Sequence, residues 1–172
     1  MSDQMIIKTD GQELTLERIF DAPTELVFQA FAEAAQLREW WGPHGWELTV
    51  CQIDFRPGGE WHYCMTCIDK NQGDLYGQES WGKAVYDLIE KPSQIVYTDY
   101  FSNADGSVSE DMPSSRIQTV FHNQAGKTRL ISRAYFDSEE SLQQVMEMGM
   151  AEGITQTWDR LEAHLERVKK FK

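Results

Sequence analysis

The stretch SEESLQQVMEMGMAEGITQTWDRLEAHLERVKKFK, residues 138–172, decides how the rest of the chain can fold. Its apolar side chains recur at intervals of three and four residues, the spacing that places them on one face of a helix. These side chains are Leu142, Val145, Met146, Met150, Ile154, Trp158, Leu161, Leu165 and Val168. Ser138 is a favourable N-cap, and Arg167 and Lys169 suit the C-terminal end of a helix dipole. The pattern predicts one amphipathic helix of about seven or eight turns, which needs an apolar surface to cover.

Most of the sequence before this helix indicates antiparallel strands. Short alternating or aromatic-rich segments are separated by turn signals such as Asn71-Gln72-Gly73 and Gln124-Ala125-Gly126. The predicted strands are residues 13–20, 46–55, 60–68, 75–89, 94–102, 115–121 and 128–136. Two short helices are predicted, one after Pro23 and one at residues 33–40. This order predicts an α+β fold in which a curved antiparallel sheet wraps around the long C-terminal helix, with the short helices closing one end.

Length and composition limit the class of protein. The chain has 172 residues, which fits a single domain over residues 1–172. Lys and Arg total 16 against 28 Asp and Glu, so the net charge is -12, and neither nucleic acid nor an anionic membrane is expected as a partner. No window is apolar enough for a membrane span, residues 1–10 contain no apolar signal core, and the cysteine count, three, is odd. These features predict a cytoplasmic protein with reduced thiols.

The cysteines and histidines form no strong catalytic or metal-binding pattern. Cys64 and Cys67 make a C-x-x-C, but residues three apart on a strand point to opposite faces and cannot readily bind one ion. Cys51 is alone in the sequence. We interpret His44 and His122 as loop or surface histidines, because the sequence places no orienting carboxylate beside them. We therefore predict no metal, no cofactor and no catalytic residue.

The aromatic side chains are the main sign of a ligand cavity. They supply more bulk than a plain core of this size requires, and Tyr and Trp add polar tips that can orient a ligand. The alternative is that they fill the core. On the strand at 60–68, Trp61, Tyr63 and Met65 share one face, which we expect to point towards the long helix, with His62 outside. The candidate ligand-binding residues are Trp40, Trp41, His44, Trp46, Trp61, Tyr63, Tyr97, Phe101, Arg133 and Trp158.

Three further features leave alternatives open. Arg133 would hold a ligand carboxylate or phenolate, or pair with Asp99 or Glu79, if its strand face is inward; an outward, solvated position is slightly favoured. Gly149 and Gly153 would let a group approach the helix backbone, or would pack tightly on the sheet. The connection at residues 102–114 would be a gate for the cavity or simply a mobile hairpin end.

Four stretches resemble the signatures of a known family. They are LERIFDAP at 16–23 with the following Val27-Phe28, LREWWGP at 37–43, DFRPGGEW at 54–61 and GMAEGITQTWDRL at 149–161. In order and spacing they are similar to the activator of heat shock protein 90 ATPase homologue (AHSA-type) family of the SRPBCC (START-like) superfamily. The resemblance implies a helix-grip fold with a deep cavity between sheet and long helix.

The resemblance does not imply one activity. The superfamily includes lipid carriers, polyketide cyclases, hormone receptors and self-sacrificing resistance proteins. The co-chaperone that gives the family its name has an additional N-terminal domain, for which this chain has no room, so direct chaperone activation is not the leading expectation.

The leading hypothesis is a binding protein, without catalysis, for a small hydrophobic ligand that is aromatic, polyketide-like or lipid-like. One alternative is a cyclase or hydrolase acting in the same cavity, which would need a titratable pair with shifted pKa values there. Another is a stress-response module acting on a chaperone, which would need a large exposed apolar patch. A homodimer and a chaperone partner remain open.

Overall fold

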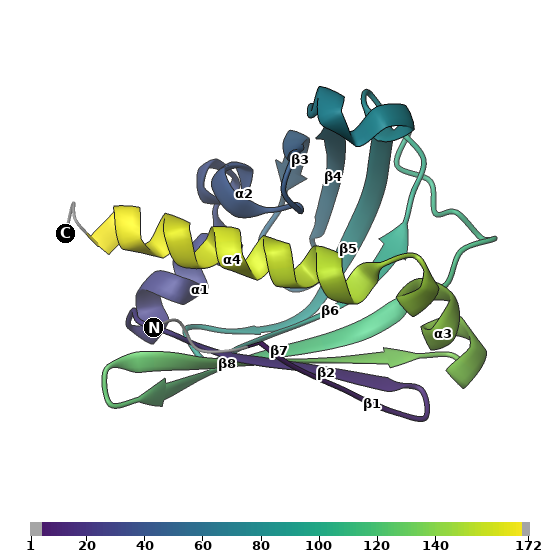
Figure 1. Cartoon of the computed structure of the whole chain (residues 1–172). Coiled ribbons are helices and arrows are strands. Elements are labelled where there is room, and N and C mark those ends of the chain that lie inside the picture. Colours follow the sequence, from purple (N-terminus) through teal and green to yellow (C-terminus); the bar gives the residue numbers. More distant parts are fainter. Residues whose placement is uncertain (1–4, 170–172) are drawn as a thin grey trace.

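The computed structural model describes residues 5–169, and within them one eight-stranded sheet forms the body of the molecule. Its strands are β1 (Ile6–Asp10), β2 (Glu13–Phe20), β3 (Trp46–Ile53), β4 (Glu60–Cys67), β5 (Glu79–Glu90), β6 (Gln94–Phe101), β7 (Ser115–Gln124) and β8 (Lys127–Phe136). The strand order is β1-β2-β8-β7-β6-β5-β4-β3, and every neighbouring pair is antiparallel. The sheet curves strongly, so that β3 to β5 stand across the direction of β7 and β8 (Figure 1).

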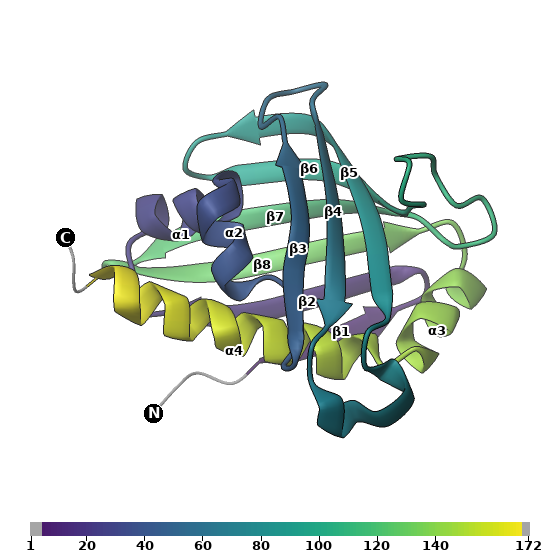
Figure 2. The same ribbon diagram turned by 90° about the horizontal axis from the view of Figure 1, so that it is seen from above.

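Helices cover the concave side of this sheet. They are α1 (Thr24–Ala32), α2 (Ala34–Trp40), α3 (Glu139–Glu147) and α4 (Met150–Lys169), with a short 3-10 helix, η1 (Lys70–Leu75), between β4 and β5. The long helix α4 lies along the sheet, α1 and α2 lie near its C-terminal end, and α3 and η1 lie at the other end (Figure 2). The predicted α+β arrangement of a curved sheet around a C-terminal helix is confirmed.

The prediction of one unbroken C-terminal helix is wrong. The chain breaks between α3 and α4 at Met148 and Gly149, and Gly149 has a φ of 86°. This left-handed conformation ends helices readily at glycine, because glycine has no Cβ to clash with the backbone. The break lets α3 turn away while α4 alone spans the sheet (Figure 1).

The largest further differences from the sequence predictions concern β1 and the start of β5. The edge strand β1 was not predicted, since its side chains are largely exposed and show little apolar alternation. Residues 70–75 form η1, so β5 begins at Glu79 instead of residue 75. The turn predicted at Gln124-Ala125-Gly126 is confirmed: β7 and β8 join directly through Ala125 and Gly126, both with positive φ.

The packing along α4 is uneven. Its C-terminal half contributes Leu161 and Leu165, which are fully or almost fully buried. At the same end of the molecule the α1 and α2 side chains Phe28, Leu37 and Trp40 are buried in the core. The N-terminal half of α4 instead borders open space, which is the cavity described below.

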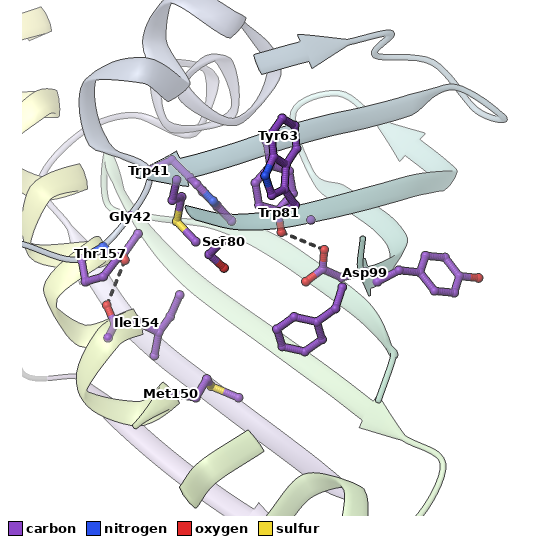
Figure 3. A pocket seen from close by; sticks show the side chains of 15 residues that line it. Trp41, Gly42, Tyr63, Ser80, Trp81, Asp99, Met150, Ile154 and Thr157 are labelled. Carbon is purple, nitrogen blue, oxygen red and sulfur yellow. Dashed lines mark hydrogen bonds between the residues drawn. The ribbon is translucent and has the colours of Figure 1, made fainter. Parts of the chain in front are cut away.

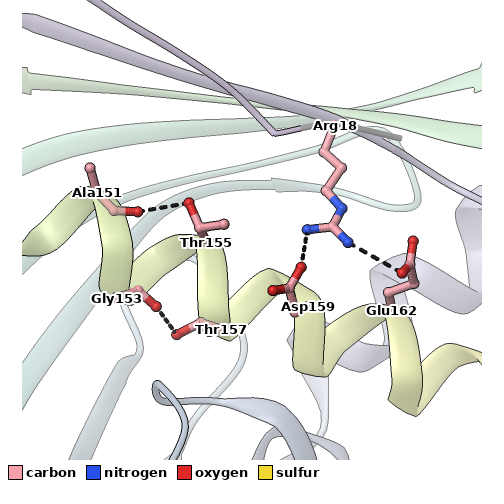
Figure 4. Close-up of polar contacts among 7 residues, drawn as sticks. All are labelled: Arg18, Ala151, Gly153, Thr155, Thr157, Asp159 and Glu162. Atoms are coloured by element: carbon pink, nitrogen blue, oxygen red, sulfur yellow. Dashed lines mark hydrogen bonds and ion pairs between the residues drawn. The ribbon is translucent and has the colours of Figure 1, made fainter. Parts of the chain in front are cut away.

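Polar contacts fix α4 over the sheet. Arg18 on β2 is 3% exposed, and its guanidinium contacts Asp159 at 2.7 Å and Glu162 at 3.3 Å, both on α4 (Figure 4). On another side of α4, Nη1 of Arg160 donates to the carbonyl oxygens of Gly42 at 2.8 Å and Trp46 at 2.9 Å. These contacts hold the helix, the sheet and the turn after α2 in one arrangement. Within residues 5–169, no helix is long and apolar enough to cross a membrane.

Candidate ligand-binding cavity

A cavity with two lobes lies between the sheet and the N-terminal half of α4. Lobe A has a volume of about 250 Å³ and lobe B about 200 Å³. Both lobes are lined by Trp41, Asp99, Phe101, Met150 and Ile154. These shared walls make the lobes direct neighbours, and together they form one cavity.

The two lobes differ in their remaining walls. Lobe A (Figure 3) is also lined by Gly42, Pro43, Tyr63, Met65, Ser80, Trp81, Gly82, Tyr100, Gly153 and Thr157. Lobe B is also lined by Leu14, Leu16, Phe31, Tyr97, Pro113, Ser115, Ile117, Thr119, Ser132, Ala134, Phe136, Val145 and Trp158. The walls are therefore mostly apolar and aromatic, with hydroxyl groups and one carboxyl among them, which is typical of small-molecule sites.

Small side chains explain why this part of the interior is hollow. The β7 and β8 positions that face lobe B include Ser115, Ser132 and Ala134, which cannot reach across to α4. On α4, a Cβ added at Gly153 would meet no atom within 4 Å. Protein interiors are normally close-packed and contain few such voids. This space stays open because the residues on both sides of it are too small to fill it.

A half-buried carboxyl group lies where the lobes meet. Asp99 on β6 accepts a hydrogen bond at its Oδ1 from the hydroxyl of Tyr63 on β4, at 3.0 Å (Figure 3). Burial raises the pKa of Asp99 from its usual 3.8 to about 7, and the Tyr63 hydrogen bond opposes part of that rise. Burial also raises the pKa of Tyr63 and of Tyr97 well above 10, so both phenols stay protonated.

Gly82 fixes where Tyr63 lies. The two residues are register partners on β5 and β4, and a Cβ at position 82 would collide with the Tyr63 ring and its hydroxyl. The absent side chain thus lets the tyrosine lie against the neighbouring strand and reach Asp99.

Half of the predicted ligand-binding residues line the cavity. They are Trp41, Tyr63, Tyr97, Phe101 and Trp158. The Trp41 ring also packs edge-on against Trp61, with 4.8 Å between the ring centroids. The ring centroids of Tyr63 and Trp61 are 4.4 Å apart. Trp61 therefore supports two cavity walls from behind without lining either lobe.

The structure places the other predicted residues outside the lobes. Trp40 is fully buried in the core, where its indole N–H donates to the Ala30 carbonyl. His44 is exposed in the turn after α2, and Trp46 is half-buried at the start of β3. Arg133 lies on β8 between Ser132 and Ala134, which line lobe B, so its side chain points to the opposite face of the sheet.

The predicted faces of β4 agree with the structure. Tyr63 and Met65 line lobe A, and Trp61 is buried behind them. His62 lies on the other side, where its ring stacks on Trp81 at 5.2 Å. It is half-buried instead of freely solvated, because its Nε2 also contacts the Asn103 carbonyl in the 102–114 connection.

The cysteine residues are free thiols in separate surroundings. Cys64 Sγ contacts Thr66 Oγ1, whereas Cys67 Sγ contacts the side-chain oxygen of Gln72, each at 3.7 Å. Cys51 Sγ accepts a hydrogen bond from the Trp61 indole at 3.3 Å. Over the described part of the chain, no three histidine, cysteine or acidic side chains gather as metal ligands would.

Sequence reasoning missed Asp99 as a site residue and considered it only as one of two possible partners for Arg133. The signal was present in the alternation of β6, where Tyr97, Asp99 and Phe101 are two residues apart and so share one face. An acidic residue between two aromatic ones on an inward face indicates a buried carboxyl. Gly82 gave no comparable signal, because its role depends on the strand pairing with Tyr63.

A curved antiparallel sheet closed by a C-terminal helix over an apolar cavity defines a helix-grip protein. The chain belongs to the family described as Activator of Hsp90 ATPase homolog 1-like protein, whose model matches residues 21–166. No curated protein matches the chain significantly.

Solved structures share the fold over almost the whole chain. The solution structure of a protein from Arthrobacter aurescens has a TM-score of 0.84 and 26% identity, and the match covers 94% of this chain and 91% of that one. A crystal structure of a protein from Mycobacterium smegmatis has a TM-score of 0.82 and 30% identity, with coverages of 93% and 96%. The AHSA1 protein from Silicibacter pomeroyi, at 23% identity and a TM-score of 0.66 over 90% of this chain and 97% of that one, agrees in fold.

Proposed function

We propose that this protein binds a small, largely hydrophobic molecule in the two-lobed cavity, without changing it chemically. The observation that carries the proposal is the wall itself, in which aromatic and aliphatic side chains from the sheet and α4 surround a space with few polar groups. Cavities with this composition bind ligands by removing apolar surface from water, while the polar groups set orientation.

The expected affinity follows from the area that a ligand can bury. A ligand of two or three fused rings that buries roughly 250 Å² of apolar surface gains about 6 kcal/mol at about 25 cal/mol per Å². Association and ordering costs subtract from this gain, so micromolar to millimolar dissociation constants are expected for simple aromatic compounds.

A thermal-shift screen tests this proposal. The panel contains flavonoids, aromatic polyketides and fatty acids, and a compound that binds the folded state raises the midpoint by mass action. The matched control is Gly153→Leu, which places a side chain in the open space of lobe A. We expect at least one aromatic class to shift the wild-type protein and to lose most of that shift in the variant. A panel without any shift, or equal shifts in both proteins, would count against cavity binding.

Asp99 supports a second candidate function, acid–base catalysis within the cavity. A carboxyl group whose pKa is about 7 can accept or release a proton near neutrality, and the Tyr63 hydroxyl, which donates to it at 3.0 Å, holds it in position. Mass spectrometry of a bound compound after long incubation separates the two candidates. Conversion that is lost in Asp99→Asn would favour the enzyme, whereas recovery of the unchanged compound would favour binding alone.

A further inference from the structure

We propose that the cavity selects ligands in which a protonated amine is attached to an aromatic or aliphatic body, and that Asp99 and Tyr63 form the binding site for the amine. This inference rests on the proposed binding function and names the chemical class of ligand. It starts from the position of Asp99, which lines both lobes and so contacts a ligand in either one.

The Asp99 carboxyl has bonding capacity left for a ligand. Its Oδ1 accepts the Tyr63 hydroxyl, and its Oδ2 has no hydrogen-bond partner among residues 5–169. In Figure 3 the carboxyl group extends from β6 towards the pocket and the Tyr63 hydroxyl, and the α4 residues Ile154 and Met150 line the same pocket. An ammonium group has three donors, so it can satisfy a carboxylate oxygen that the protein leaves free.

The charge balance of the walls favours a cation. Within the described chain, no Lys, Arg or His lines either lobe, and Asp99 is the sole acidic side chain there. The titratable groups that face it are the phenols Tyr63 from β4, Tyr86 from β5 and Tyr97 on its own strand, and burial raises the pKa of each. The β5 and α4 residues that line the lobes carry no charge. The guanidinium of Arg160 donates instead to backbone carbonyls of the turn after α2. A ligand ammonium therefore supplies the countercharge that the protein lacks.

The aromatic walls favour the same class of ligand. Trp41, Tyr63 and Phe101 line lobe A together with Asp99, and aromatic ring faces attract cations. At longer range, the net charge of -12 attracts cations to the protein. An anionic ligand such as a fatty acid would instead place a second negative charge next to Asp99, so the inference narrows the ligand classes that the sequence left open.

The amine class also predicts a pH dependence. Burial raises the pKa of Asp99 to about 7, so the empty cavity holds a partly protonated carboxyl near neutrality. A bound ammonium stabilises the ionised carboxylate, so binding becomes tighter as the pH rises from about 5.5 to 8 while the amine stays protonated.

Three matched probes test the inference by titration calorimetry. Tryptamine, tryptophol and indole-3-acetate share an indole body and differ in the cationic, neutral or anionic group. We expect wild-type protein at pH 8 to bind tryptamine at least tenfold more tightly than tryptophol, and indole-3-acetate most weakly. In Asp99→Asn the tryptamine affinity should fall at least tenfold, while tryptophol should change less than threefold. The control Asp87→Asn removes an acidic group that lines neither lobe and pairs with Arg116, and should leave the preference intact.

The outcomes separate this inference from the function on which it rests. Equal binding of tryptamine and tryptophol by the wild-type protein would overturn amine selection while supporting cavity binding. Failure of all three probes to bind would overturn amine selection, and the thermal-shift panel would then decide separately whether the cavity binds other ligands. If Asp99→Asn does not fold, the wild-type protein alone decides, because the preference for tryptamine over tryptophol must be at least threefold smaller at pH 5.5 than at pH 8. A preference that does not change with pH would contradict a role for Asp99.

Discussion

Tyr63 and Gly82 are paired across β4 and β5, and the tyrosine ring occupies the space that any side chain at position 82 would need. This relationship links an ordinary feature of sheet packing to the chemistry of the cavity. The ring position that Gly82 permits is also the position from which the Tyr63 hydroxyl reaches Asp99, at 3.0 Å.

Gly82→Ala should therefore disturb both stability and the site. The added Cβ displaces the Tyr63 ring, and we expect the free energy of unfolding in urea to fall by about 1–3 kcal/mol. Loss of the Tyr63 hydrogen bond should raise the pKa of Asp99 further, which carboxyl carbon NMR can follow. The control is Gly153→Ala, whose Cβ meets open space and should stabilise α4 by about 0.5–1 kcal/mol. Equal effects of the two alanines would refute the close approach at Gly82.

Asp99→Asn should change how stability depends on pH. The folded-state pKa of Asp99, about 7, lies above its usual 3.8, so between these values the folded protein binds more protons than the unfolded chain. Ionisation of Asp99 therefore lowers the free energy of unfolding of the wild-type protein as the pH rises from about 4 to about 7. The asparagine variant has no carboxyl to ionise at this position, so its stability does not fall for this reason. We expect the variant to gain about 2 kcal/mol on the wild type between pH 4 and pH 8. A pKa shift from 3.8 to about 7 corresponds to at most about 4 kcal/mol. The expected gain is smaller because solvent in the cavity screens the exposed side of the carboxyl. Parallel stability curves for the two proteins would show that Asp99 is ordinarily solvated.

The ion pairs of Arg18 should have an asymmetric effect on stability. Arg18 is 3% exposed, whereas Asp159 and Glu162 are 47% and 31% exposed. Removal of both acids by Asp159→Ala with Glu162→Ala leaves a buried, unpaired guanidinium and should cost about 3 kcal/mol. Arg18→Met should cost less, because it removes the charge and also a buried Nε that has no hydrogen-bond partner among the described residues. Urea unfolding at pH 7 gives both values, and a larger loss in Arg18→Met would contradict this account.

The sequence predicted the arrangement of sheet and helix well because that arrangement depends on periodicity. The apolar spacing around Leu161 and Leu165 and the alternation of β2 both reflect burial on one face. Where periodicity conflicts with backbone geometry, the prediction was wrong. The apolar repeat continues through Met146 and Met150, but Gly149 adopts a positive φ between them and ends α3. The edge strand β1 was missed because an edge strand needs little apolar alternation.

The cavity residues were predictable only in part. Aromatic residues can fill a core or line a hollow, and sequence does not separate these roles: the neighbours Trp40 and Trp41 lie in the core and in the cavity wall respectively. The difference depends on what lies opposite each ring, which is set by small residues on distant elements such as Gly153 and Ala134. The polar anchor at Asp99 could have been found from its position between Tyr97 and Phe101 on one strand face.

Xenon binding followed by NMR tests most directly whether the space beneath α4 is hollow, because xenon enters apolar cavities without any chemical recognition. We expect saturable chemical-shift changes at methyl groups of Met150, Ile154 and Leu16, which line the lobes, and none of comparable size at Leu161 in the packed half of α4. Small shifts that grow linearly with xenon pressure and are no larger at the lobe methyls than at Leu161 would show that the side chains fill this space, and would contradict the account.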